Sequence, residues 1–122
     1  MRAIWHHGHM PSRSFEVAID ANDPQRLRRF WLAALGYVEQ TTAEGAVDLV
    51  DPAGRGPTIW FQHVSEAKTA KNRLHLDLLV SAPERAALTK QLTDLGGSVI
   101  NDHPRFTVMA DPEGNEFCLT ES

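Results

Sequence analysis

The stretch "ADPEGNEFCL", residues 110–119, decides the fold, because it repeats a pattern found earlier in the same chain. The segment "VDPAGRGPTIWF", residues 50–61, carries the same Asp-Pro-x-Gly sequence 60 positions before it. A proline at the start of each predicted helix (Pro24 and Pro83) and a Leu-Gly pair at its end recur at an offset of 59 or 60. Landmarks that recur in the same order indicate a duplicated structural unit.

Each unit contains one predicted helix with clear start and stop signals. In the first unit, Asp23 is a suitable N-cap, a proline follows it, and Gly36 ends the helix. In the second unit, Ser81 and Glu84 have the spacing of a capping box, and a Gly-Gly pair follows Leu95. Each predicted helix is therefore flanked by residues that fix both of its ends.

Alternating apolar and polar residues predict four strands in each unit. The expected strands are 14–20, 37–42, 46–50 and 57–63, and then 73–80, 98–101, 105–110 and 115–120. We therefore expect an α+β fold in which each module runs strand, helix, strand, strand, strand. The chain is predicted to form one domain over residues 14–122, made of modules 14–63 and 73–121 joined by a polar linker. Residues 1–13 are expected to be a flexible leader that the native protein need not contain.

Composition narrows the classes of function. The chain has 122 residues, of which 42% are hydrophobic and 23% charged, as expected for one soluble domain. A net charge of −4 argues against nucleic acid as a partner, and no apolar run approaches the roughly 20 residues that span a membrane. The single cysteine, Cys118, cannot form an intrachain disulfide, which favours a reducing, cytoplasmic location.

The alternation also separates two faces of the predicted sheets. One face is aliphatic and is expected to pack under the helices; it includes Phe15, Val17, Ile19, Leu74, Leu76 and Leu78. The opposite face collects polar and aromatic side chains: Glu16, Trp60, Gln62, His75, Asp77, Glu116 and Cys118. This second face is either a solvated sheet surface or the lining of a small-molecule site.

Three segments resemble a known family. "DPQRLRRFWLAALGY" (23–37), "NRLHLDLLV" (72–80) and "VMADPEGNEFCL" (108–119) are similar to the glyoxalase-like branch of the vicinal oxygen chelate superfamily. That superfamily includes glyoxalase I, bleomycin-resistance proteins, fosfomycin-resistance enzymes and extradiol dioxygenases. The resemblance implies two βαβββ modules whose mixed sheet curls around a concave cavity, with the helices outside. It also implies a homodimer, which the aromatic stripe of the first helix (Phe30 and Trp31) favours as well.

The resemblance implies four positions for a divalent metal ion, one on the first and one on the last strand of each module. They correspond here to Glu16, Trp60, His75 and Cys118. His75 and Glu16 could be ligands, whereas Trp60 cannot coordinate a metal. Cys118 stands where metal-dependent relatives carry Glu, and it is either a zinc ligand or an inert buried residue. We therefore expect no intact family metal site; a Zn, Ni, Mn or Fe ion, if bound, would be held by Glu16 and His75.

Without a metal, the candidate catalytic residues are His75, Asp77 and Glu16. Asp77 lies two residues after His75 on the same face, so it could orient the imidazole as a general acid or base, or the pair could simply stabilise the sheet. The candidate ligand-binding residues are Trp60, Gln62, Glu116 and Cys118.

Three functions remain open for a small-molecule-binding protein with this set of residues. The first is a metal-free lyase or isomerase acting on a small polar or aromatic metabolite. The second is a protein that sequesters its ligand without turnover, as bleomycin-resistance proteins do. The third is a metal-dependent lyase that uses Glu16 and His75.

Overall fold

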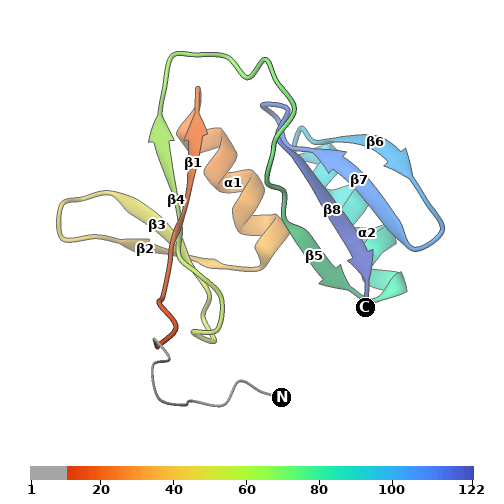
Figure 1. The fold of residues 1–122 in the computed structure, drawn as a ribbon, viewed down its shortest axis with the longest axis horizontal. Coiled ribbons are helices and arrows are strands. Elements are labelled where there is room, and N and C mark those ends of the chain that lie inside the picture. The colour runs from red at the N-terminus through yellow and green to blue at the C-terminus, as the bar shows by residue number, and fades with distance from the viewer. Residues whose placement is uncertain (1–10) are drawn as a thin grey trace.

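The computed structural model describes residues 11–122 and contains two βαβββ modules arranged side by side (Figure 1). The first module comprises β1 (Val17–Ala21), α1 (Pro24–Leu35), β2 (Val38–Thr41), β3 (Val47–Val50) and β4 (Ile59–His63). The second comprises β5 (Asp77–Val80), α2 (Ala82–Asp94), β6 (Ser98–Asp102), β7 (Phe106–Ala110) and β8 (Glu116–Glu121). Most of the expected leader lies outside the described residues, and residues 11–13 are exposed and have no regular structure.

Both modules have the same sheet topology. The strand orders are β1-β4-β3-β2 and β5-β8-β7-β6, and in each sheet the first and last strands of the module pair in parallel while the others pair antiparallel. The predicted α+β fold of two tandem modules is therefore confirmed. Over residues 11–122 the strands form two four-stranded sheets, and β1 and β5 lie at the sheet edges that face the other module (Figure 1).

The helix boundaries follow from the capping residues. The Asp23 carboxylate accepts a hydrogen bond from the Arg26 N–H at 3.2 Å, and Gly36 ends α1 with a φ of 66°. At α2, Ser81 and Glu84 form both hydrogen bonds of the capping box. Between residues 11 and 122, no helix combines the length and the hydrophobicity that crossing a membrane would require.

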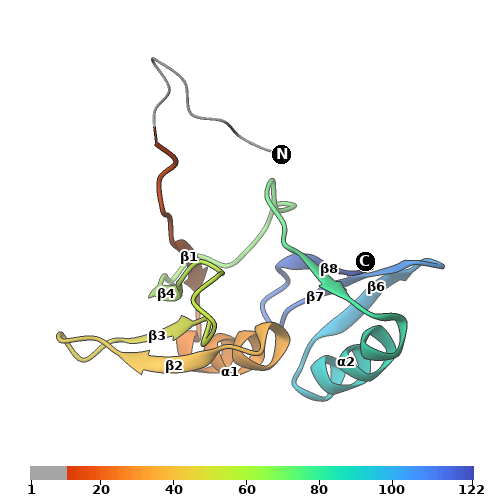
Figure 2. The ribbon, with the colours of Figure 1, turned by 90° about the horizontal axis from the view of Figure 1, so that it is seen from below.

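The core is continuous between the modules. Both helices lie on one side of the sheets (Figure 2), and the buried face of α1 includes Phe30 and Trp31. Phe117, from β8 of the other module, is fully buried against both rings, with centroid distances of 5.7 Å to Phe30 and 4.9 Å to Trp31. The aromatic stripe of α1 is thus covered within the chain, so it gives no support to the predicted homodimer.

The second Asp-Pro-x-Gly turn also joins the two modules. Asp111 is only 3% exposed, and its carboxylate accepts a hydrogen bond from the indole N–H of Trp31 at 3.0 Å. Two residues further on, the Glu113 carboxylate accepts hydrogen bonds from the backbone N–H groups of Asn22 and Asp23, both at 2.7 Å. The turn at the end of one module therefore holds the start of α1 in the other.

Candidate functional site

A cavity of about 680 Å³ lies between the modules, beside β1 and the segment that leads into β5. Three of the predicted site residues line it, namely Glu16, His75 and Glu116. The rest of the lining is mostly apolar and consists of Phe15, Val17, Ala18, Ile19, Asp20, Trp31, Asn72, Leu74, Leu76 and Asn115. Apolar walls with a few polar groups are typical of small-molecule sites.

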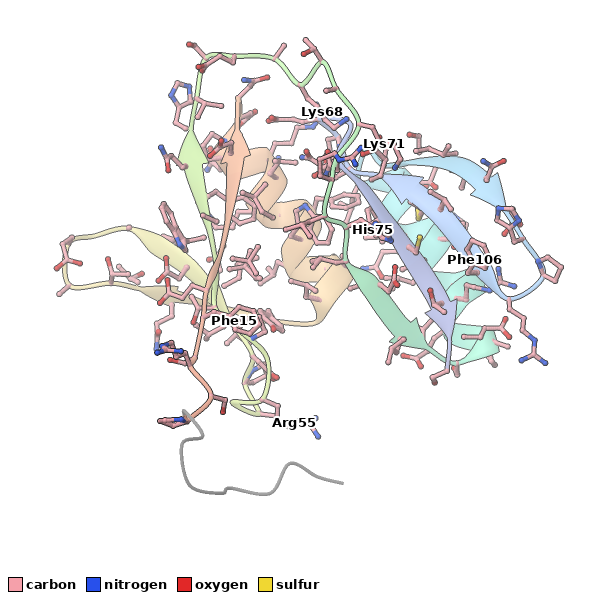
Figure 3. The ribbon with its side chains drawn as sticks, in the orientation of Figure 1. Phe15, Arg55, Lys68, Lys71, His75 and Phe106 are labelled. Atoms are coloured by element: carbon pink, nitrogen blue, oxygen red, sulfur yellow. The ribbon has the colours of Figure 1, made fainter. Side chains whose placement is uncertain are left out.

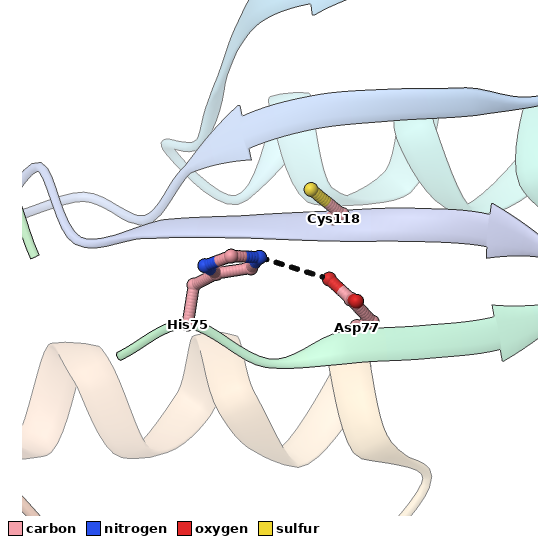
Figure 4. Close-up of side chains that lie close together, drawn as sticks. All are labelled: His75, Asp77 and Cys118. Atoms are coloured by element: carbon pink, nitrogen blue, oxygen red, sulfur yellow. Dashed lines mark ion pairs between the residues drawn. The ribbon is translucent and has the colours of Figure 1, made fainter. Parts of the chain in front are cut away.

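His75 and Asp77 are in contact at the edge of this cavity. The strand expected over residues 73–80 begins only at Asp77, and His75 lies just before it. The His75 Nε2 atom is 3.2 Å from the Asp77 Oδ1 atom (Figure 4), and the two side chains are 47% and 54% exposed. The carboxylate can orient the imidazole, and both groups remain accessible to a ligand.

Cys118 lies beside this pair because of the sheet register. The parallel pairing of β5 with β8 places Asp77 opposite Cys118, and the Cys118 N–H donates to the Leu76 carbonyl oxygen at 2.9 Å. Burial, and then the neighbouring Asp77 carboxylate, raise the pKa of the Cys118 thiol, although the positive charge of Lys71 acts in the opposite direction. The thiol is therefore protonated at neutral pH and is not an activated nucleophile.

Glu116 has a structural role at the rim of the cavity. Its carboxylate accepts a hydrogen bond from the Asn72 N–H at 3.1 Å and contacts the Lys68 ammonium at 3.4 Å. The pKa of Glu116 is lowered, chiefly by the Asn72 hydrogen bond. Figure 3 shows Lys68 and Lys71 on the linker that leads to His75. Glu116 thus fixes the path of the linker that carries these side chains.

Trp60 and Gln62 lie away from the cavity. Both are on β4, which pairs with β1 on the side that faces away from β5 (Figure 1). Neither residue lines the cavity between the modules. The predicted set is thus divided between the cavity (Glu16, His75 and Glu116), the His75–Asp77–Cys118 group, and a separate surface on the first sheet.

The sequence pattern predicted the wrong environment for two residues that line the cavity. Phe15 and Leu74 were expected under the helices, but they are 68% and 89% exposed. Both precede the first residue of their strand, Val17 and Asp77, so they lie beyond the part of the sheet that the helix covers. The alternation runs through both residues, so the sequence held no signal that could have identified them as lining residues.

The four metal positions implied by the family do not fit a metal site in this chain. The Trp60 indole has no atom that can ligate a metal. Among residues 11–122, the one group of three or more His, Cys, Asp or Glu side chains whose ligand atoms lie within 4.8 Å of one another is His75, Asp77 and Cys118, and it does not include Glu16. A site shared between the two modules is therefore not supported.

Comparisons with known proteins agree with this architecture. The family model of the glyoxalase-like domain matches residues 16–120. The fold is similar to that of the hypothetical protein SA1046 from S. aureus, at 16% identity, a TM-score of 0.73, and coverage of 93% of this chain and 96% of that one. It is also similar to the fosfomycin resistance protein FosX from Mesorhizobium loti, at 12% identity, a TM-score of 0.74, and coverage of 91% and 92%.

A third similar structure is a variant of FosX from Listeria monocytogenes in complex with Mn(II) and 1S,2S-dihydroxypropylphosphonic acid. It has 14% identity, a TM-score of 0.71, and coverage of 91% of this chain and 90% of that one. A search of curated protein sequences found no match. At these identities the structural neighbours establish the fold, while the family model spans nearly the whole chain. The chain therefore belongs to the glyoxalase-like domain family of the vicinal oxygen chelate superfamily.

Proposed function

We propose that this protein binds a small molecule in the cavity between its modules and uses His75 as a general acid or base on it. The observation that carries the proposal is the position of His75, which lines the cavity and contacts the Asp77 carboxylate at 3.2 Å. A carboxylate that holds an imidazole at the edge of an apolar cavity is suited to proton transfer. This chemistry corresponds to a metal-free lyase or isomerase.

The cavity lining favours a neutral or cationic ligand with an apolar or aromatic part. Phe15 and Leu74 are exposed to the cavity and can cover a planar group, while the Glu16 carboxylate can accept hydrogen bonds from it. The FosX variant from Listeria binds a phosphonic acid together with Mn(II). Here Glu16 and Glu116 are both in the cavity, and Glu116 already pairs with Lys68, so we do not expect an anion of that kind to bind.

Binding without turnover is the second candidate. The observation that favours it is the loss of two ligands from the four family metal positions. One of these positions holds Trp60, and another holds Cys118, whose thiol is protonated. A protein of this kind would use the cavity to sequester its ligand. The third possibility raised by the sequence, a metal-dependent lyase that uses Glu16 and His75, receives no support, because Glu16 does not join His75 in a ligand group among residues 11–122.

The two candidates separate in one experiment. Small aromatic and cationic metabolites are screened by thermal shift, and each binder is then tested for turnover by nuclear magnetic resonance. We expect His75→Ala to lower turnover about 10²- to 10⁴-fold, the usual contribution of a general acid or base, while the ligand still binds. His63→Ala is the matched control, because His63 is exposed on β4 outside the cavity.

Two outcomes would contradict the acid-base proposal. Turnover that is unchanged in His75→Ala would remove His75 from the chemistry. Tight binding with no turnover by the unmodified protein would instead favour sequestration.

We also propose that the protein is a homodimer in a reducing, cytoplasmic compartment. The exposed apolar side chains of Phe15, Leu74 and Leu79 support an apolar contact with a second copy. The free thiol of Cys118 is consistent with a reducing location. Light scattering at micromolar concentration should give twice the 13.6 kDa mass of the chain, and a monomer would contradict the dimer.

A further inference from the structure

The strongest further feature is the group in which Cys118 joins the His75–Asp77 pair of the proposed function (Figure 4). One ligand atom from each side chain lies within 4.8 Å of the other two. The register between β5 and β8 brings Asp77 and Cys118 together, and the His75–Asp77 contact of 3.2 Å adds the imidazole. All three side chains come from the second module, so the group does not depend on how the two modules are arranged.

We propose that these three side chains bind one Zn²⁺ ion within the second module, in place of the site shared between modules that the family implies. The donors are an imidazole nitrogen, a carboxylate oxygen and a sulfur, all of which are ordinary zinc ligands. Sulfur also makes the set selective for thiophilic ions over Mg²⁺ or Ca²⁺. Three protein ligands leave the fourth tetrahedral position of the ion to a water molecule.

The geometry is close to what zinc requires. Zinc–ligand distances of roughly 2.0 to 2.3 Å place the ligand atoms of a tetrahedral site roughly 3.3 to 3.8 Å apart. Because the ligand atoms lie within 4.8 Å of one another, they have to close by no more than roughly 1 to 1.5 Å. The exposed side chains of His75 and Asp77 have room for that movement, and an ion can reach them directly from solvent.

The local charges favour a cation on balance. Zinc would replace the thiol proton of Cys118 and leave a thiolate next to the Asp77 carboxylate, so two negative ligands would face the ion. Lys71 is close enough to influence the thiol, and its positive charge opposes the bound metal. Because Lys71 is exposed, this opposition is partly screened by solvent and salt.

The first module provides an internal comparison. Its parallel pair places Ala18 opposite Trp60, where the second module has Asp77 opposite Cys118. Neither Ala18 nor Trp60 offers a ligand atom, so the equivalent strand pair of the first module supplies no metal ligand at these positions. The zinc site goes beyond the proposed function, because its occupancy can be measured without any substrate. A bound ion would also occupy the His75 nitrogen, so zinc-loaded protein should lose His75 as an acid or base.

The test uses the full-length chain with His6, His7 and His9 replaced by Gln, so that histidines near the N-terminus cannot contribute. Co²⁺ is titrated as a spectroscopic probe, followed by Zn²⁺ in a calorimeter. We expect one ion per chain and a thiolate-to-cobalt charge-transfer absorption that disappears in Cys118→Ser. Asp77→Asn and His75→Gln should each weaken Zn²⁺ binding at least tenfold, while the control Glu16→Gln leaves it unchanged. Lys71→Gln should tighten binding about two- to fivefold, as expected for one screened charge.

A second measurement needs no substitution at the ligands. Cys118 is the single cysteine of the chain, so alkylation by iodoacetamide reports on that thiol alone. Stoichiometric Zn²⁺ should slow its alkylation at least tenfold, and a chelator should restore the original rate. Equal alkylation rates with and without Zn²⁺, or a cobalt spectrum without a charge-transfer band, would overturn the proposal.

Discussion

The two modules share one architecture but differ in chemistry at equivalent positions. In the first module the parallel strands place Ala18 opposite Trp60, and in the second they place Asp77 opposite Cys118. The strand order, the helix and the Asp-Pro-x-Gly turn are the same in both. The comparison teaches that the fold constrains the side chains that face the helices, while those on the opposite face are free to acquire different functions.

The two Asp-Pro-x-Gly turns also differ in what they hold. Within residues 11–122, Asp51 accepts hydrogen bonds only from backbone N–H groups of its own turn, those of Ala53, Arg55 and Gly56. Asp111 makes the equivalent local bonds but is buried, and it also binds Trp31 in the other module. The turn at Asp51 is therefore stabilised by local hydrogen bonds alone, whereas the turn at Asp111 also links the two modules.

Among the variants that test the comparison of the modules, Phe117→Ala should cause the largest loss of stability. Phe117 is fully buried between Phe30 and Trp31 of the first module, so its loss should destabilise the protein by about 3 to 5 kcal/mol. Ile59→Ala, at the equivalent position of β4, should cost about 2 to 3 kcal/mol. Urea unfolding followed by circular dichroism measures both. A smaller loss for Phe117→Ala than for Ile59→Ala would show that the contact between the modules is not the dominant one.

The second effect is expected from Asp111→Ala. This change leaves the buried Trp31 N–H and the Asn115 side chain without their acceptor, and it should cost about 2 to 4 kcal/mol. The control is Asp51→Ala, for which we expect a smaller loss because only local bonds in an exposed turn are removed. Urea midpoints of the two variants decide the matter, and equal losses would mean that the Trp31 bond contributes little.

The smallest effect is a pH dependence in the first turn. The N–H groups of Ala53 and then Gly56 lower the pKa of Asp51 below its ordinary value of 3.8. The carboxylate therefore stabilises the fold above about pH 4, and this contribution is lost as the pH falls through the lowered pKa of the folded state. The difference in urea midpoint between the unmodified protein and Asp51→Asn should be constant from pH 7 to pH 5 and should shrink below pH 4. A difference that persists at pH 2 would contradict this origin.

Most of the fold could be predicted from local signals. The Asp23 cap, the Ser81–Glu84 box and Gly36 fix the helix ends by interactions within a few residues, so the sequence alone locates them. The start of β5 could not be placed, because alternation continues through Leu74 although the chain there is not covered by a helix. The ends of a strand depend on which residues are covered by a helix in the folded protein, and a local sequence pattern does not contain that information.

The candidate site was predictable only in part, for a similar reason. The His75–Asp77 contact was expected from their spacing of two residues, although His75 lies just before β5 and not on it. The proximity of Asp77 to Cys118 depends on a parallel register between segments 41 positions apart in the chain. The hydrogen bond from Trp31 to Asp111 joins residues 80 positions apart, and neither the helix pattern around Trp31 nor the turn pattern around Asp111 predicts it. Contacts of this kind depend on how distant segments meet, and alternation cannot specify that.

The Trp31–Asp111 bond and the burial of Phe117 against α1 have a consequence for the continuity of the chain. Cohesion between the halves comes from these contacts and from Glu113, and not mainly from the peptide linkage through residues 64–72. Two separate polypeptides divided in that segment should therefore reassemble by fragment complementation.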